Sequence, residues 1–205
     1  MPSIYGLKPK FQSLLRPVTN AIARAGITAN QVTLLAMALS FAVGAAIFHL
    51  RTQRSLLLLP VVLFVRMALN AIDGMLAREH DQKTALGAIL NELGDVFSDA
   101  ALYLPLAFFP GFAPELVVLI VLFAVFSEMT GVIAVQIGAS RHYDGPMGKS
   151  DRAFVFGLLG LLLGLNFPIV PLVRYVLWIV LALLLLTIVN RARKALAELQ
   201  GSEPR

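Results

Sequence analysis

"NAIDGMLAREHDQKTALGAILNELGDVFSD", residues 70–99, is the stretch that decides the fold. It places charged and amide side chains inside a chain made mostly of Leu, Ala, Val and Phe. Of the 205 residues, 58% are hydrophobic and only 14% are charged, which is too apolar for an ordinary soluble domain. The composition therefore predicts an all-α integral membrane protein, and the polar stretch must be explained inside a membrane.

Six transmembrane helices are predicted from the apolar runs and from the charged, Gly-rich or Pro-rich segments that separate them. The expected spans are 30–49, 55–78, 84–109, 113–138, 152–167 and 170–190. Thirteen Lys and Arg residues fall on the side of the two termini and three on the other side. By the positive-inside rule, both termini are expected in the cytoplasm, for a multi-pass protein of the cell inner membrane.

The first segment, residues 1–29, is predicted to be an amphipathic juxtamembrane helix on the cytoplasmic face. Phe11, Leu14 and Val18 fall on one side of this helix, and Lys10 and Arg16 fall on the other. A cleaved signal peptide is the alternative, but about 30 residues would precede its apolar region, which is too many. The six-helix membrane domain then covers residues 30–195, and residues 196–205 form a cytoplasmic tail.

Two polar stripes occur within the opening stretch and the residues just before it. In the second span the stripe consists of Arg66, Asn70, Asp73 and Ala77, and in the third span of Gly87, Asn91, Asp95 and Asp99. Spacings of three and four residues place each set on one helix face. Because the connecting loop is short, the two helices are expected to be antiparallel neighbours. Small residues would let their backbones approach closely: Gly74, Ala77, Gly87, Ala88 and Gly94.

An ionised side chain at mid-bilayer costs about 2.5–3.5 kcal/mol, so these stripes need a reason. One reason is structural, with Arg66 paired to Asp99 or to Glu128 of the fourth span. That reason is weaker for Asp73 and Asp95, which are expected near the cytoplasmic ends of their helices.

The amide and carboxylate oxygens of Asn70, Asp73, Asn91 and Asp95 suit Mg²⁺ or Mn²⁺. Such an ion at a membrane surface suggests phosphate chemistry. The absence of cysteine excludes thiolate catalysis and cysteine-ligated metals.

The stretch resembles the signature of the class-I CDP-alcohol phosphatidyltransferases, D-x-x-D-G-x-x-A-R-x8-G-x3-D-x3-D. Six positions match in type and spacing: Asp73, Gly74, Ala77, Arg78, Gly87 and Asp95. "ITANQVT", residues 27–33, is similar to the family's I-T-P-N-x-x-T, with Ala29 where proline is usual. The chain as a whole is similar to a poorly characterised bacterial inner-membrane branch of this family.

The resemblance implies an enzyme of phospholipid biosynthesis that moves a phosphatidyl group from CDP-diacylglycerol, or a similar CDP-lipid, to a hydroxyl acceptor and releases CMP. It implies that Asp95 is the general base and that one or two Mg²⁺ or Mn²⁺ ions are bound by Asn70, Asp73, Asn91 and Asp95. A homodimer and no nucleic-acid partner are expected. The residues that it assigns to CDP-lipid binding are Asn30, Thr33, Gly74, Ala77, Arg78 and Gly87.

Two departures concern the metal site, because the first and third signature aspartates are Asn70 and Asn91 here. Four carboxylates would balance two divalent ions, whereas Asp73 and Asp95 balance one. Three outcomes are open: the substrate diphosphate completes a second metal site, Glu92 or Asp99 rotates in to restore charge, or the protein uses one metal or none. The first is favoured.

A basic cluster before the fifth span contains Arg141, Lys149 and Arg152. It either sets topology or binds the acceptor, which would then be anionic, such as glycerol phosphate or an inositol phosphate. Two other functions stay open. A catalytically silent protein that binds CDP-lipid or stabilises a partner is favoured by the two asparagines. A small transporter is compatible with six spans but leaves the signature unexplained.

Overall fold

The protein is described by a computed structural model that covers residues 8–143 and 145–202, and every regular element in these ranges is a helix. Residues 1–7 and 203–205 of the predicted N-terminal segment and tail lie outside the described residues. The elements in chain order are α1 (Lys8–Arg24), α2 (Ala29–Leu50), η2 (Gln53–Leu57), α3 (Leu58–Glu79), α4 (Ala85–Tyr103), η3 (Leu104–Phe108), α5 (Pro114–Gln136), α6 (Lys149–Gly164) and α7 (Val170–Ser202).

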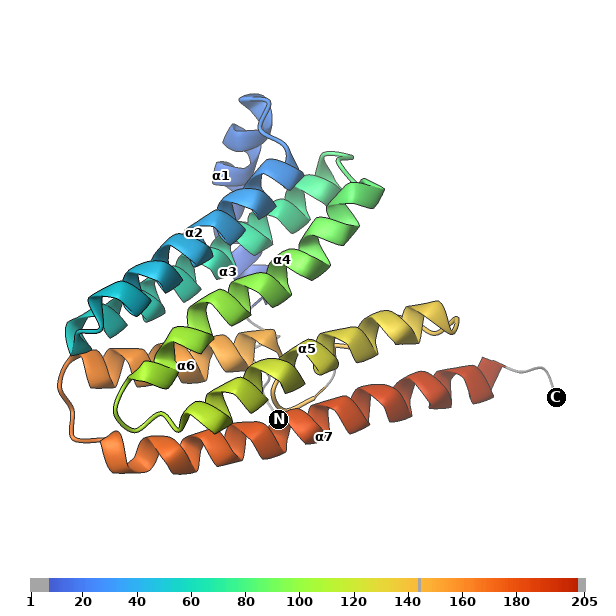
Figure 1. The fold of residues 1–205 in the computed structure, drawn as a ribbon. Coiled ribbons are helices and arrows are strands. Elements are labelled where there is room, and N and C mark those ends of the chain that lie inside the picture. Colours follow the sequence, from blue (N-terminus) through green and yellow to red (C-terminus); the bar gives the residue numbers. More distant parts are fainter. Residues whose placement is uncertain (1–7, 144, 203–205) are drawn as a thin grey trace.

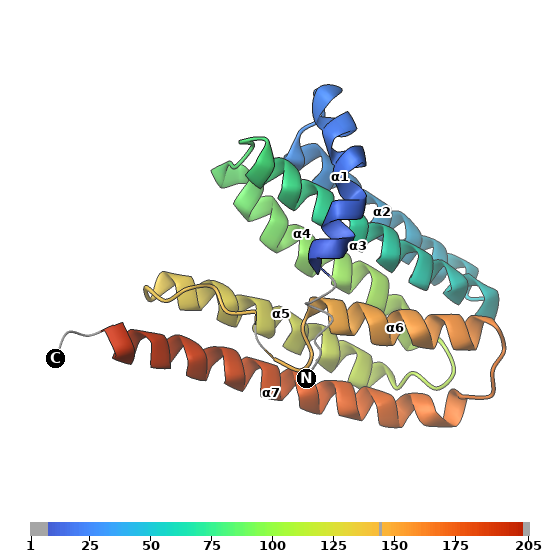
Figure 2. The ribbon, with the colours of Figure 1, turned by 180° about the vertical axis from the view of Figure 1, so that it is seen from behind.

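The long helices form two groups, α2 with α3 and α4, and α5 with α6 and α7 (Figure 1). Within and between the groups, α2 packs along both α3 and α4, α5 packs along α7, and α6 packs against α3. The α2–α3, α4–α5 and α6–α7 connections lie at one end of the bundle. At the other end, which carries the α3–α4 and α5–α6 connections, the two groups diverge (Figures 1 and 2). We call this second end the open end.

Four helical segments are long and apolar enough to cross a membrane: Ala29–Leu50, Gln53–Glu79, Pro114–Gln136 and Val170–Gly201. The protein is therefore a helical membrane protein, as the composition predicts. Each of the six expected spans corresponds to a helix. However, α4 carries three acidic residues and α6 has only 16 residues, so crossing by these two helices remains a prediction.

Three helix boundaries differ from those expected. Helix α4, which corresponds to the third expected span, ends at Tyr103. A 3₁₀ turn follows, because Pro105 cannot continue the α-helical hydrogen bonds. Helix α6 begins at Lys149, where the Asp151 carboxylate accepts a hydrogen bond of 3.0 Å from the Gly148 N–H. Helix α7 continues past residue 190 to Ser202, through a segment rich in the good helix formers Ala, Leu, Glu and Lys.

The first helix, α1, is amphipathic and packs against α3. Two polar contacts join it to the C-terminal end of α3. Arg16 forms an ion pair of 2.9 Å with Glu79, and the Asn20 side chain lies 3.2 Å from His80. Leu14 on the outer side is 74% exposed. A helix is thus present where the sequence predicts one, and its place at a membrane surface remains a prediction.

The apolar core gathers toward the end opposite the open end, where Ile47, Leu56, Leu102, Leu106 and Phe156 pack together. Helices approach closely there, since a Cβ atom on Gly44 of α2 would meet the carbonyl oxygen of Ala101 in α4. A smaller apolar cluster lies under α1 at the open end. The polar side chains of α3 and α4 lie between these two apolar clusters.

Candidate active site at the open ends of α2, α3 and α4

The start of α2 is fixed to the α3–α4 connection. Thr28 caps the helix by accepting a hydrogen bond from the Gln31 N–H, and the Gln31 side chain accepts one from the Thr28 N–H. The Ala29 N–H donates to Gln82 Oε1 over 2.7 Å. These bonds hold the first turn of α2 beside the predicted site.

Thr33 joins α2 to α3. Its hydroxyl donates to Asp73 Oδ2 over 2.8 Å and also lies 3.1 Å from the Ala29 carbonyl oxygen. Asp73 is only 5% exposed, so this bond orients a largely buried carboxylate. The sequence predicted Thr33 for the nucleotide and Asp73 for the metal, and the two side chains touch.

Two glycines leave room for polar side chains at the same end. A Cβ atom on Gly87 would lie 2.7 Å from the Asn30 side-chain oxygen, and one on Gly74 would lie 3.1 Å from the Arg78 guanidinium. Asn30 also lies 3.4 Å from the Thr84 hydroxyl. We refer to the residues gathered here as the helix-end cluster: Asn30, Thr33, Asp73, Gly74, Arg78 and Gly87.

Asp95 of α4 lies between the helix-end cluster and the bundle interior. Its Oδ1 accepts from Asn70 Nδ2 over 3.2 Å, from Arg66 over 3.4 Å and from the Lys149 ammonium group. Its side chain is 23% exposed. Because two basic side chains and an amide contact one oxygen, this carboxylate is held in place while part of it remains accessible.

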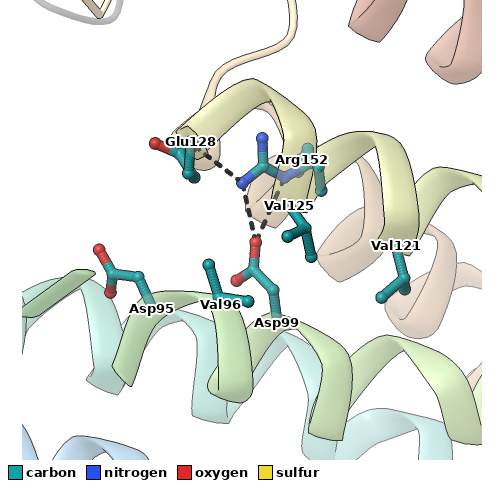
Figure 3. A pocket seen from close by; sticks show the side chains of 8 residues that line it. Asp95, Val96, Asp99, Val121, Val125, Glu128 and Arg152 are labelled. Carbon is teal, nitrogen blue, oxygen red and sulfur yellow. Dashed lines mark hydrogen bonds and ion pairs between the residues drawn. The ribbon is translucent and has the colours of Figure 1, made fainter. Parts of the chain in front are cut away.

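Behind Asp95, the described residues form a buried charge network, which we define as Arg66, Asp99, Glu128, Arg152 and Arg191. Asp99 accepts from Arg66 over 2.5 Å and from Arg152 over 2.9 and 3.2 Å. Figure 3 shows Asp99 on α4 facing Arg152, which also reaches Glu128 on α5. Removing one of these partners would leave a buried charge uncompensated.

Glu128 is the point where three arginines meet. Its carboxylate lies 3.3 Å from Arg152, 3.2 Å from Arg191 and 3.5 Å from Arg141. Arg141 also pairs with Glu92 over 2.7 Å. The α5–α6 connection and α7 are therefore tied to α4 and α5 through carboxylates.

The structure brings most of the predicted site residues together. Asn70 and Arg66 of the first stripe reach Asp95 and Asp99 of the second, so the stripes meet as predicted and Arg66 pairs with Asp99. Ala77 packs in the small apolar cluster beneath α1. Asn91 is exposed one turn before Asp95. Of the basic residues, Lys149 reaches Asp95, whereas Arg141 and Arg152 reach Glu128.

One expectation about the packing is wrong. Helices α3 and α4 make little direct backbone contact, because α2 packs along both of them. Their small residues face other partners: Gly87 lies beside Asn30 and Gly94 lies 3.7 Å from the Thr33 methyl group, measured from an ideal Cβ. The polar stripes meet through long side chains instead.

Arg191 belongs to the buried charge network, a position near the acceptor side that the sequence allowed but did not establish. Its Nη1 donates to the Ser127 carbonyl oxygen over 2.6 Å and pairs with Glu128. The available signal is an arginine that follows an apolar run of some 20 residues, and this pattern is also typical of a topology determinant. Only the packing of α7 on α5 distinguishes the two roles.

The oxygen donors at the site can be compared with the ligands that a divalent metal needs. Among the described residues, no three His, Asp or Glu side chains converge as ligands. Asp73 and Asp95 supply two carboxylates, and Asn70, which contacts Asp95, supplies an amide one turn from Asp73. Without substrate, this set of hard oxygen donors fits one Mg²⁺ or Mn²⁺ ion in type and in charge, and a second ion would need the charge of a substrate diphosphate.

The sequence profile of the CDP-alcohol phosphatidyltransferases matches residues 26–189, which include the helix-end cluster and Asp95. The chain belongs to the CDP-alcohol phosphatidyltransferase family. This assignment confirms the expected family and enzyme class, a transferase of phospholipid biosynthesis, and it agrees with the position of the signature residues on α3 and α4.

Two relatives align with nearly the whole length of this CDP-alcohol phosphatidyltransferase family member. The chain is 48% identical to the inner membrane protein YnbA of Escherichia coli (strain K12), over 95% of this chain and 96% of the relative. It is 26% identical to a phosphatidylinositol phosphate synthase of Mycolicibacterium smegmatis (strain ATCC 700084 / mc(2)155), over 100% of this chain and 94% of that protein.

Solved structures share the fold. The phosphatidylinositol phosphate synthase of Mycobacterium tuberculosis with CDP-DAG bound superposes with a TM-score of 0.73, at 22% identity, over 92% of this chain and 96% of that chain. The same enzyme in complex with manganese and citrate also gives a TM-score of 0.73, over 92% of each chain. At this identity, the likeness concerns the fold alone.

Proposed function

We propose that this protein transfers a phosphatidyl group from CDP-diacylglycerol, or a similar CDP-lipid, to a hydroxyl acceptor. The acceptor oxygen bonds to the lipid-side phosphorus, the bond from that phosphorus to the bridging diphosphate oxygen breaks, and CMP leaves with that oxygen. The observation that carries this proposal is the position of Asp95, a partly exposed carboxylate held between the helix-end cluster and the basic residues.

The helix-end cluster is proposed to bind the CDP-lipid. Gly74 and Gly87 leave room for the Arg78 guanidinium and the Asn30 amide at the helix surface, and Arg78 offers its guanidinium to phosphate oxygens. Asn30 and Thr33 supply hydrogen bonds from the first turn of α2. Ala77 is small, so it adds no side chain that would cover this surface.

Asp95 is proposed to be the general base. Contacts with Lys149 and Arg66 fix the position of its carboxylate, and its 23% exposure allows a substrate hydroxyl to reach it. The proton of that hydroxyl passes to the carboxylate as the oxygen attacks phosphorus. The contact with Lys149 also orients the Asp95 carboxylate toward the acceptor side of the site.

A divalent ion, Mg²⁺ or Mn²⁺, is proposed to be bound by Asp73 and Asp95 with the amide oxygens of Asn70 and Asn91. Members of this family are typically metal-dependent, and a relative has been solved with manganese. When bound, such an ion offsets the charge of the diphosphate. Because the protein contributes two carboxylates, we expect weak metal binding without CDP-lipid and much tighter binding with it.

Arg141, Lys149 and Arg152 are proposed to line the acceptor side of the site. They contact carboxylates on α4 and α5 rather than lipid-facing surface, which supports a role in the site over one in topology alone. We also propose six spans with both termini in the cytoplasm, α1 (Lys8–Arg24) at the membrane surface, and a homodimer in the bacterial inner membrane.

The test is CMP release from CDP-diacylglycerol by the purified protein in mixed micelles, with Mg²⁺ or Mn²⁺ and a panel of hydroxyl acceptors. We expect acceptor-dependent release that Asp95→Asn abolishes and that Asp81→Asn, a change in the exposed α3–α4 loop, leaves intact. Calorimetry supplies the metal test. Tight binding of two ions in the absence of CDP-lipid would contradict the metal proposal.

A second candidate function is catalytically silent binding of CDP-lipid, or stabilisation of a partner enzyme. It is favoured by Asn70, whose amide donates to Asp95 where the signature has another carboxylate. This function predicts CDP-diacylglycerol binding in the same micelles with no CMP release from any acceptor.

A further inference from the structure

Glu128 occupies the centre of the basic residues on the acceptor side. Its carboxylate lies within 3.5 Å of Arg141, Arg152 and Arg191, and its side chain is 12% exposed. Arg152 and Arg191 are 1% and 2% exposed. An internal anion is therefore already bound where three guanidinium groups converge.

Two of these arginines also form ion pairs with carboxylates other than Glu128. Arg152 also pairs with Asp99 over 2.9 Å, and Arg141 pairs with Glu92 over 2.7 Å. Lys149, the remaining basic residue of the acceptor side, contacts Asp95. A phosphate group that entered this cluster would meet the Glu128 carboxylate, and like charges in such proximity disfavour binding.

The cluster nevertheless retains unused hydrogen-bonding capacity. Within the described part of the chain, the Ser127 hydroxyl and the Arg141 Nε are buried and have no hydrogen-bond partner. Buried polar groups are normally paired, so such atoms suggest that another molecule completes them. A small cavity lies between Glu128 and the proposed base, lined by Asp95, Asp99, Glu128 and Arg152 together with Val96, Val121, Ala124 and Val125 (Figure 3).

We propose that Glu128 determines acceptor specificity by taking the place of an acceptor phosphate, so that the acceptor is an uncharged polyol. Hydroxyl groups of the acceptor bind the Glu128 carboxylate, and one hydroxyl lies beside Asp95. This inference rests on the proposed transfer reaction. It differs from the anionic acceptor that the basic residues alone predict, because those residues have internal carboxylate partners.

The first experiment compares matched acceptors in the CMP-release assay: glycerol against glycerol phosphate, and inositol against inositol phosphate. For the wild-type protein, we expect kcat/KM for the uncharged member of a pair to exceed that for the phosphorylated member by about tenfold or more. In E128Q, the ratio should shift toward the phosphorylated member by about tenfold. E79Q is the matched control, because Glu79 pairs with Arg16 of α1 instead of the three arginines, and its ratio should stay near that of the wild type.

The second experiment uses no catalysis. Inorganic phosphate is titrated against the unfolding midpoint of the purified protein without CDP-lipid. Phosphate should raise the midpoint of E128Q and leave that of the wild type unchanged.

The outcomes separate the two proposals. A wild-type preference for phosphorylated acceptors, or an unchanged ratio in E128Q, overturns the role of Glu128 and leaves the transfer reaction standing. Absence of CMP release with every acceptor overturns the transfer reaction. In that case the second experiment decides on Glu128. Its role is also overturned if inorganic phosphate raises the unfolding midpoint of the wild type as much as that of E128Q. The wild-type comparisons need no variant, so they decide the matter even if E128Q does not fold.

Discussion

The helix-end cluster and the buried charge network lie on either side of Asp95 and differ in how their polar groups are satisfied. In the helix-end cluster, Asp73 accepts one hydrogen bond from Thr33, and Arg78 lies exposed beside Gly74. In the buried charge network, Asp99 is paired with two arginines and Glu128 with two members of the network and Arg141.

This difference separates binding capacity from structural cohesion. The helix-end cluster has few internal ion pairs, so the remaining hydrogen-bonding capacity of its polar groups is available to a ligand. The buried charge network uses its charges on one another and joins α3, α4, α5, α6 and α7. Substitutions in the helix-end cluster should therefore affect mainly activity, whereas substitutions in the buried charge network should lower stability as well.

The largest expected effect is on catalysis at the border between the regions. Asp95→Asn should lower kcat for CMP release by about 10²–10⁴-fold, because an amide cannot accept the acceptor's proton. The unfolding midpoint should change little, since Asp95 is partly exposed. Asp81→Asn in the exposed loop is the control. Full activity in Asp95→Asn would remove Asp95 as the base.

The next effect is on stability. Arg152→Met should lower the free energy of unfolding by about 3–5 kcal/mol, because it leaves Asp99 and Glu128 buried without a shared partner. Thermal unfolding in detergent measures it, with exposed Arg193→Met as the control. If Arg152→Met unfolds like the wild type, the buried charge network does not hold the helices together and the contrast between the regions fails.

A smaller effect is expected on the affinity of the site for a divalent metal. Asn70→Asp places a second carboxylate beside Asp95, so Mn²⁺ should bind the lipid-free protein about tenfold more tightly or better. Titration followed by the electron paramagnetic resonance of free Mn²⁺ measures this change. Asn190→Asp, on an exposed part of α7, is the control. Equal affinity in Asn70→Asp and the wild type would place the ion elsewhere.

The smallest effect is expected at the edge of the open end. Arg16→Gln removes the ion pair with Glu79, but both side chains are well exposed, at 50% and 37%, and water and salt screen the pair. The unfolding midpoint and CMP release should both stay within experimental error. A loss as large as that of Arg152→Met would mean that α1 belongs to the structural core of the bundle.

Local sequence patterns predicted the order of the helices and the residues of the helix-end cluster. Hydropathy identified each long helix, and a signature with fixed spacing identified Asp73, Gly74, Arg78, Gly87 and Asp95. This success has a physical reason. Periodicity within one helix, and the geometry of two helices joined by a short loop, are local properties of the chain.

Contacts between distant helices could not be predicted in the same way. The three arginines that meet Glu128 come from the α5–α6 connection, α6 and α7, and hydropathy says which helix face is polar but not which neighbour it meets. For the same reason, the sequence suggested that α3 packs on α4, whereas α2 packs along both. Arg191 was indistinguishable from a topology determinant until α7 was placed against α5.

The late position of the Glu128 partners along the chain has a consequence for biosynthesis. Asp99 on α4 can pair with Arg66, which is synthesised before it, but Glu128 on α5 precedes Arg141, Arg152 and Arg191. An acidic residue in an apolar helix is costly to hold without a partner. A chain that stalls after α5 thus carries an unneutralised carboxylate within an apolar helix, and only the synthesis of the α5–α6 connection, α6 and α7 supplies the arginines that neutralise it.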